Sequence, residues 1–127
     1  MRNDKAYNNL KWLFIVLLFI AGSCSQQKFD KDKWSEREDP AFPPSSRARM
    51  LDDLITNHDL VGLSYKDLVA RLGMPDNKDE DIVTYKIVVE YGTDIDPVYT
   101  KDLVFTISKD SSITSMKVRD WKTENVK

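Results

Sequence analysis

Residues 64–75 read Ser64-Tyr65-Lys66-Asp67-Leu68-Val69-Ala70-Arg71-Leu72-Gly73-Met74-Pro75. This stretch predicts a short helix with a recognisable start and a recognisable end. Ser64 and Asp67 have the spacing of a capping box, in which the hydroxyl accepts from exposed amides and the carboxylate reaches back. Gly73 supplies the left-handed residue that often follows a helix, and Pro75 prevents the helix from continuing. The apolar residues between these ends form one stripe, which must pack against another element.

A second helix is predicted just upstream. Ser45 or Ser46 can cap its start, and Asn57-His58 is expected to end it. Its apolar residues recur at helical spacing and share one face: Met50, Leu51, Leu54 and Ile55. The remaining surface is expected to carry the charged residues Arg47, Arg49, Asp52 and Asp53.

Downstream of residue 82 the apolar pattern changes to period two, which predicts β-strands. Alternating runs cover 83–91, 103–107 and 114–118. A short polar turn at 109–112 separates the last two runs, so they should pair as an antiparallel hairpin. Each run keeps a polar face, so the sheet should be covered on one side only. The predicted fold class is therefore α+β, with two N-terminal helices packed on one face of a three-stranded antiparallel sheet.

The stretch from Gly62 to Pro75, followed by a strand that carries Tyr85, resembles the SmpA/OmlA family of small outer-membrane lipoproteins. The family pattern is roughly G-x-[ST]-x-x-[EQD]-V-x-x-x-L-G-x-P and then a strand with an aromatic residue; Leu68 stands where Val is usual. The family includes a subunit of the β-barrel assembly machinery, and its fold is two helices on a three-stranded sheet. The resemblance implies the same fold and a role in an envelope complex.

The N-terminal residues have the three parts of a secretory signal. A basic stretch and an apolar run from Trp12 to Ile20 precede the small residues of Ala21-Gly22-Ser23-Cys24. The run is shorter than the ~20 apolar residues of a membrane span. Cys24 is the only cysteine, so it has no internal disulfide partner. The ending resembles a bacterial lipobox, which implies cleavage before Cys24 and acylation of its thiol; the alternative is an ordinary signal with an incidental cysteine.

These features divide the chain into a lipoprotein signal peptide (1–23), a polar tether (24–44) and an α+β domain (45–127). The tether is rich in charge and proline, so it is not expected to bury enough apolar surface to order itself. Extended, it would reach roughly 60–70 Å. Phe29, Trp34 and Phe42 interrupt this composition. Either these aromatic residues fold back onto the domain, or they contact a partner, with Trp34 and Phe42 as candidate binding residues.

Composition and residue types argue against several classes of protein. The formal net charge of −2 gives no basic surface for a nucleic-acid partner. His58 is the only histidine, and at a predicted helix end it is expected to interact with terminal carbonyls and not to act in catalysis. A single Cys and a single His provide no zinc ligand set, and the acidic run 76–81 lacks the spacing of a calcium loop. We therefore expect no enzymatic activity, no cofactor and no metal.

The sequence predicts a lipid-anchored scaffold or accessory protein of an envelope complex, such as the one that assembles outer-membrane β-barrels. The alternative is a lipid-anchored binding or inhibitor module that shares only the fold. The expected partners are the membrane, through acylated Cys24, and an envelope protein. Ser25 follows the cysteine, in place of the aspartate that retains lipoproteins in the inner membrane of enteric bacteria. The expected location is therefore the outer membrane, on its periplasmic face.

The lipid anchor is directly testable at Cys24. Replacing it by serine removes the thiol that would be acylated, so the Cys24→Ser precursor should remain uncut or unlipidated. Mass spectrometry of the wild-type protein should detect acyl groups on the new N-terminal residue. A wild-type protein without acyl groups would contradict the membrane assignment as a whole.

Overall fold

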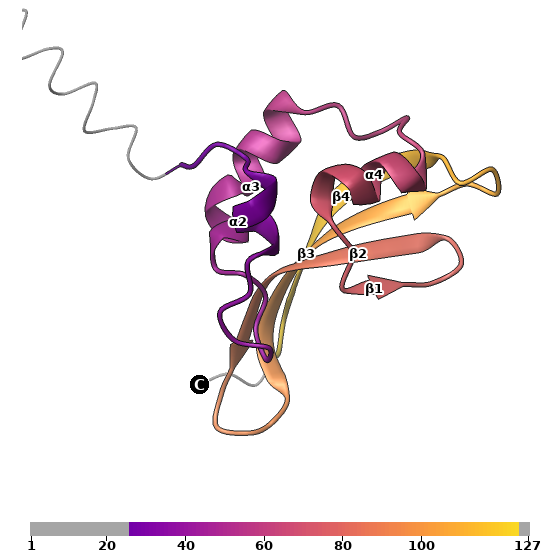
Figure 1. Cartoon of the computed structure of the whole chain (residues 1–127). Coiled ribbons are helices and arrows are strands. Elements are labelled where there is room, and N and C mark those ends of the chain that lie inside the picture. Colours follow the sequence, from indigo (N-terminus) through magenta and orange to yellow (C-terminus); the bar gives the residue numbers. More distant parts are fainter. Residues whose placement is uncertain (1–25, 125–127) are drawn as a thin grey trace, which may run out of the picture.

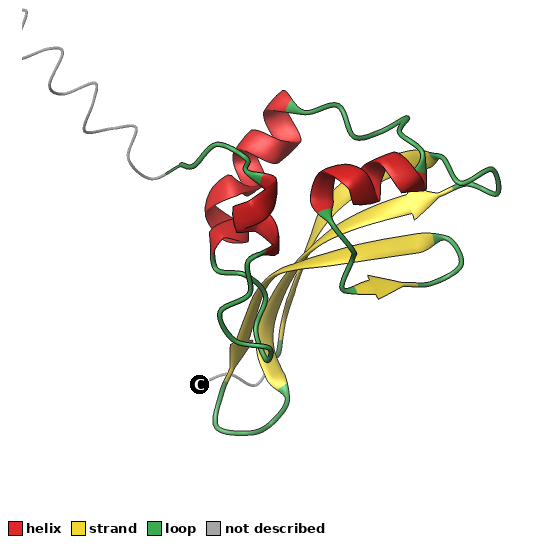
Figure 2. Ribbon diagram, viewed as in Figure 1, coloured by secondary structure: helices red, strands yellow, loops and turns green. Residues whose placement is uncertain are grey.

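The computed structural model describes residues 26–124, so the predicted signal peptide and Cys24 lie outside the described residues. The described helices are α2 (Lys31–Ser35), α3 (Ser46–Asn57) and α4 (Tyr65–Leu72). The described strands are β1 (Asn77–Lys78), β2 (Ile82–Tyr91), β3 (Pro97–Ile107) and β4 (Ile113–Lys122). They form one antiparallel sheet in the order β1-β2-β3-β4, and the helices gather on one side of it (Figures 1 and 2).

The predicted fold class was wrong: the sheet has four strands instead of three, and three short helices replace the two that were expected. β1 has only two residues, which pair with Thr84 and Val83 of β2. α2 has five residues and lies in the predicted tether. Neither element is long enough to show a hydrophobic period, and short helices depend on tertiary packing for their stability. The contacts that form these elements come from the rest of the fold.

The three longer strands contain the segments where the alternating pattern predicted them, but β3 begins at Pro97, six residues before the predicted run 103–107. β2 pairs with β3, and β3 pairs with β4, both antiparallel, which confirms the predicted hairpin across 109–112. The buried residues Val83, Tyr85, Leu103 and Phe105 stand at alternate positions of their strands and pack in one core with the apolar residues of the helices. A register shift between Lys86 and Val88 inserts one extra residue into β2. Beyond this bulge β2 and β3 continue as an arm that leaves the helices behind (Figure 1).

Residues 26–35, which were expected to belong to a tether, pack along α3. The Gln27 N–H donates to the Arg49 carbonyl at 3.1 Å, and the Phe29 N–H donates to the Asp53 carboxylate at 2.7 Å. The Phe29 bond holds the pKa of Asp53 below its usual range. Trp34 of α2 is completely buried in the core, and its ring meets that of Phe29 edge to face at 5.7 Å. Of the two possibilities for the aromatic residues, Phe29 and Trp34 follow the first, because they fold back onto the domain.

The ends of α4 follow the predicted chemistry in part: the Ser64 hydroxyl caps the helix, but among the described residues the Asp67 carboxylate does not reach back to the Ser64 N–H, and Gly73 differs in its ψ angle. The Ser64 hydroxyl accepts from the Asp67 N–H at 3.1 Å, as an N-cap should. Gly73 ends the helix with φ 80° and ψ −176°, so its φ is positive but its ψ is extended and not left-handed helical. A Cβ atom on Gly73 would lie 2.9 Å from the Ser35 hydroxyl oxygen. Gly73 is therefore required both by its backbone angles and by the close approach of α2.

Two glycine variants separate these requirements. Gly73→Ala should lower the free energy of unfolding by about 1–3 kcal/mol, because its region of φ and ψ is almost exclusive to glycine and its Cβ meets Ser35. Gly62→Ala should cost less, since Gly62 also has a positive φ but has nothing within 4 Å of an added Cβ. Denaturant titrations of both variants measure the difference. Equal losses would show that contact with α2 does not contribute.

Candidate functional site

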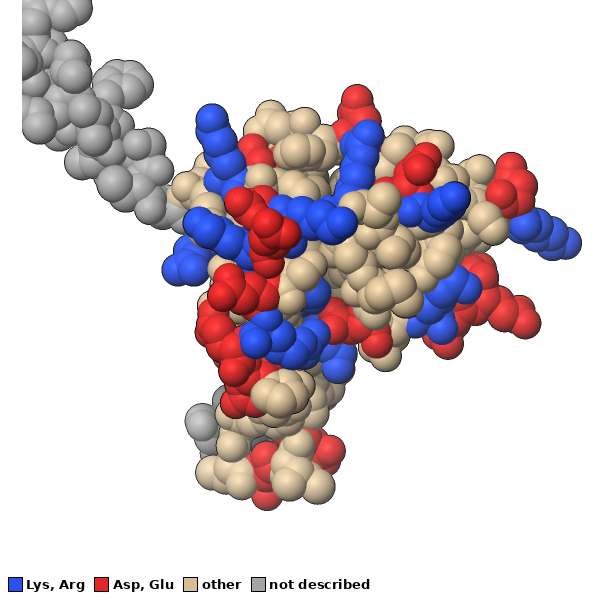
Figure 3. All heavy atoms as spheres, in the orientation of Figure 1, with Lys and Arg blue, Asp and Glu red and all other residues tan. Residues whose placement is uncertain are grey.

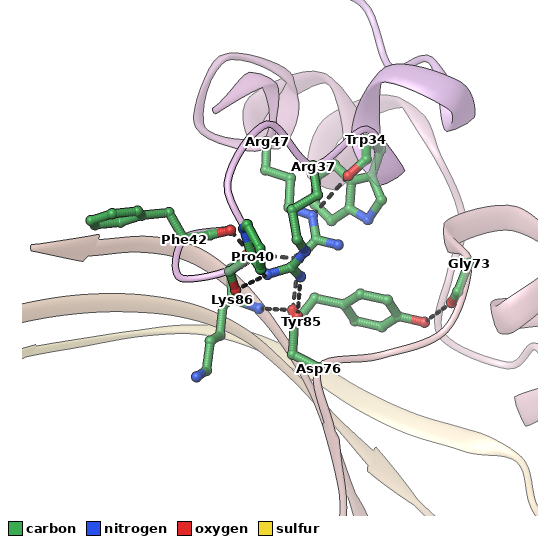
Figure 4. Close-up of polar contacts among 9 residues, drawn as sticks. All are labelled: Trp34, Arg37, Pro40, Phe42, Arg47, Gly73, Asp76, Tyr85 and Lys86. Carbon is green, nitrogen blue, oxygen red and sulfur yellow. Dashed lines mark hydrogen bonds and ion pairs between the residues drawn. The ribbon is translucent and has the colours of Figure 1, made fainter. Parts of the chain in front are cut away.

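The outer edge of β2 is closed by an ion pair where its strand partner ends. β1 covers this edge only at Val83 and Thr84. Two residues further on, the Asp76 carboxylate accepts from the Lys86 N–H at 2.7 Å and from the Arg47 guanidinium at 2.7 Å. Arg47 also donates to the Lys86 carbonyl at 2.8 Å (Figure 4). Both backbone groups of Lys86 are thus bonded as they would be to a paired strand. We call Arg47, Asp76 and Lys86 the edge clamp.

Arg47 enters this clamp from the core side of α3 and is only 3% exposed. Its Nε donates to the Trp34 carbonyl at 2.9 Å, and its guanidinium carbon lies 5.1 Å from the centre of the Trp34 ring. Burial lowers the pKa of Arg47, while the hydrogen bond to Asp76 opposes that shift. An arginine in this position stays charged, so Asp76 and the aromatic faces must compensate for its lost hydration.

Arg37 forms a second ion pair with Asp76 and extends the clamp to the segment before α3. Its guanidinium donates to the other Asp76 carboxylate oxygen at 2.8 Å and to the Phe42 carbonyl at 2.9 Å. Burial raises the pKa of Asp76, but the Lys86 N–H and the two arginines outweigh it, and the net pKa is lowered. The contacts of Arg37 hold the segment from 37 to 42 in place, so they determine where Phe42 is presented.

Tyr85 connects the same strand to the end of α4. Its hydroxyl donates to the Gly73 carbonyl at 2.7 Å, and its ring lies against Trp34 and Phe105. Burial raises the pKa of Tyr85, so the phenol keeps its proton at neutral pH. The aromatic residue noted in the predicted strand therefore has a structural contact with the glycine that ends the preceding helix.

The polar groups of the clamp are bonded to one another, which suits them to stabilise a sheet edge. Within residues 26–124 no group of three or more His, Cys, Asp or Glu side chains could hold a metal ion. Among the same residues no helix has the length and apolarity to cross a membrane. No family model, curated protein or solved structure matches the chain.

The residues predicted as sites lie in very different environments. Cys24 is outside the described residues. Trp34, one of the two candidate binding residues, is completely buried in the domain core, so it follows the alternative in which it folds back onto the domain. Phe42 is 41% exposed, and its ring meets that of Tyr91 edge to face at 5.6 Å. His58 is the C-cap of α3 and lies 3.5 Å from the Asp53 carboxylate.

Sequence reasoning missed Arg47 and Asp76. Arg47 was expected on the polar surface of its helix, but it is buried with Met50, Leu51 and Leu54. The signal was present, because Arg47 precedes Met50 by three positions and Leu51 by four, which places all three on one helix face. Asp76 was noted only as the first residue of the acidic run 76–81, and nothing local in the sequence distinguishes it from the acidic residues that follow.

Removing one partner of the buried ion pair should destabilise the domain strongly. Arg47→Met leaves Asp76 and the Lys86 carbonyl short of a donor, so we expect a loss of about 3–5 kcal/mol in the free energy of unfolding. Arg119→Met is the matched control: it removes an ion pair with Asp102 on the same sheet in which the arginine is exposed, in contrast to Arg47, and it should cost less than about 1 kcal/mol. Denaturant titration measures both. Similar small losses would show that the clamp does not stabilise the fold.

The contribution of Asp76 should depend on pH in a defined direction. Folding lowers the pKa of Asp76, so its carboxylate contributes stability above the unfolded pKa of about 3.9 and loses it as the pH falls through the folded pKa. The stability difference between the wild type and Asp76→Asn should therefore be largest above about pH 5 and shrink below about pH 4. Urea titrations at several pH values measure this difference. A difference that is independent of pH would contradict the assignment.

Proposed function

We propose that this protein is a lipid-anchored accessory protein of an envelope complex at the outer membrane, and that it acts by docking a protein partner. The observation that carries the proposal is the group of exposed apolar side chains at the free end of the sheet. This group, the aromatic end, consists of Phe42, Tyr91, Ile95 and Trp121, with exposed fractions of 41%, 43%, 91% and 50%. Exposed aromatic residues of this kind are typical anchors of protein interfaces.

The aromatic end combines parts of the chain that are distant in sequence. Tyr91 ends β2, Ile95 lies in the turn before β3, and Trp121 lies near the end of β4 opposite Thr100. Phe42 joins them through its contact with Tyr91. Because Arg37 bonds to the Phe42 carbonyl, this ring is positioned by the edge clamp before any partner arrives.

The position of the anchor favours a partner contact at this end. Only Ser25 separates Cys24 from Gln26 in the sequence, so a lipid on Cys24 would be attached close to the first described residue. The described chain begins beside α2 and α3, whereas the β2–β3 turn is at the other end of the arm (Figure 1). An anchored protein would therefore have its aromatic end free. The resemblance to a family of outer-membrane lipoproteins supports the same role.

Crosslinking in native membranes tests this proposal. A photoreactive side chain at position 121 of the full-length protein should capture an envelope protein, and one at Met74, which is 73% exposed beside α4, should not. Tyr91→Ala combined with Trp121→Ala should reduce recovery of the complex by at least roughly 30-fold, as truncation of even one buried interface aromatic typically costs ~2 kcal/mol. Met74→Ala is the control. Unchanged recovery in the double variant would contradict docking at the aromatic end.

A further inference from the structure

Next to the aromatic end, β2 has a stretch of edge without a strand neighbour among the described residues. β1 pairs only with Val83 and Thr84, and the edge clamp closes Lys86, but β2 continues to Tyr91. Thr84 accepts from the Asp76 N–H, so residues 84 and 86 direct backbone groups to this edge. The register shift between Lys86 and Val88 adds one residue to β2. Val89 is therefore the next residue whose backbone N–H and C=O point to the outer edge.

A groove of about 400 Å³ runs beside this part of the edge. Phe42 and Pro43 line it from the segment before α3, and Val88 and Val89 line it from β2. Its surface is mostly apolar, and its size suits one or two aliphatic side chains of an extended segment. A strand added at Val89 would alternate its side chains between this groove and the opposite face of the sheet.

Two carboxylates line the same groove, those of Glu38 and Asp39. Each accepts one hydrogen bond from a neutral neighbour, Ser45 and the Ala41 N–H, and neither belongs to an ion pair among residues 26–124. Figure 3 shows acidic side chains gathered over α2 and the segment that follows it. The charge of this wall therefore complements a positively charged occupant.

We propose that the partner of this protein binds as an extended peptide segment that adds a strand to β2 at Val89, places apolar side chains in the groove and pairs a Lys or Arg with Glu38 and Asp39. The inference rests on the proposed docking function and specifies the chemistry of the partner. Main-chain bonds to the edge provide affinity in this mode, and the pockets provide selectivity. The edge clamp defines the register, because strand addition cannot extend past Lys86.

The test uses the full-length protein in neutral detergent micelles and a fluorescent, end-blocked peptide of about seven residues that alternates Val with Lys and Thr. Fluorescence anisotropy should detect binding of this peptide and weaker binding of its counterpart with Glu in place of Lys. Val89→Pro removes the outward N–H at a position where an edge strand tolerates proline, and should weaken binding at least about tenfold. Val89→Thr keeps the N–H and should bind within about twofold of wild type.

The carboxylates provide an independent variant that leaves the backbone intact. The double variant Glu38→Gln with Asp39→Asn keeps both hydrogen bonds to neutral groups but removes the charge. It should weaken binding of the Lys peptide roughly three- to tenfold at low salt, and that binding should no longer depend on salt concentration. Glu36→Gln is the matched control, since Glu36 is an exposed acid of the same segment outside the groove. No binding by the wild type, or equal binding by Val89→Pro, would overturn the proposal.

Two further outcomes distinguish strand addition by a partner peptide from dimerisation through the same edge and from docking without strand addition. A concentration-dependent dimer that Val89→Pro dissociates would assign the edge to a second copy of the chain and overturn the peptide proposal. Suppose that Val89→Pro binds the peptide as tightly as the wild type and still recovers the crosslinked partner, whereas the Tyr91→Ala and Trp121→Ala double variant does not recover it. Strand addition is then wrong, and docking at the aromatic end stands.

Discussion

The buried ion pair between Arg47 and Asp76 is the interaction on which the rest of this structure depends. It links α3, the loop between α4 and β1, and the middle of β2, three parts of the chain that are separate in sequence. Burial strengthens the attraction between the two charges. It also has a cost in desolvation free energy, because each charge has exchanged water for the other charge and for aromatic faces. The pair therefore serves more as a geometric constraint than as a source of net stability. It determines where strand pairing on β2 stops and where the segment carrying Phe42 begins.

The N-terminal part of the described chain belongs to this constraint as well. α2 places Trp34 against both Arg47 and Tyr85, so the indole ring helps to cover the charge that the clamp buries. Ser35 approaches Gly73 closely, and the Gly73 carbonyl accepts from Tyr85. A change in α2 is thus transmitted to the clamp through side chains that are in contact. A segment with the composition of a linker is in this way part of the core.

Sequence reasoning predicted the elements that carry their own signal. The N-cap of α4, the apolar face of α3 and the alternation in β2, β3 and β4 are local patterns, and each of these elements contains the segment where its pattern lay. The missed elements, α2 and β1, are short and polar. α2 forms because its Trp34 packs into the core, and β1 forms because it pairs with the outer edge of β2. The same reason explains the site: Phe42 was noticed as an aromatic residue, but its pairing with Tyr91 and the burial of Arg47 depend on contacts across the fold. One signal in the sequence could have been used: Arg47 stands at helical spacing from the apolar residues Met50 and Leu51, which indicates that it shares their buried face.

The short connection between Cys24 and the folded body has a consequence for how such a protein would meet its partner. A lipid at that position would confine the domain to a layer only about as thick as the domain itself, with a radius of gyration of about 13 Å for 100 residues. The search for a partner would then take place in two dimensions, and the local concentration of the domain at the membrane would greatly exceed its average in the compartment. An edge of modest intrinsic affinity is sufficient under that condition. The geometry also selects partners, because only segments that approach the membrane surface to within the length of the β2–β3 arm can reach it.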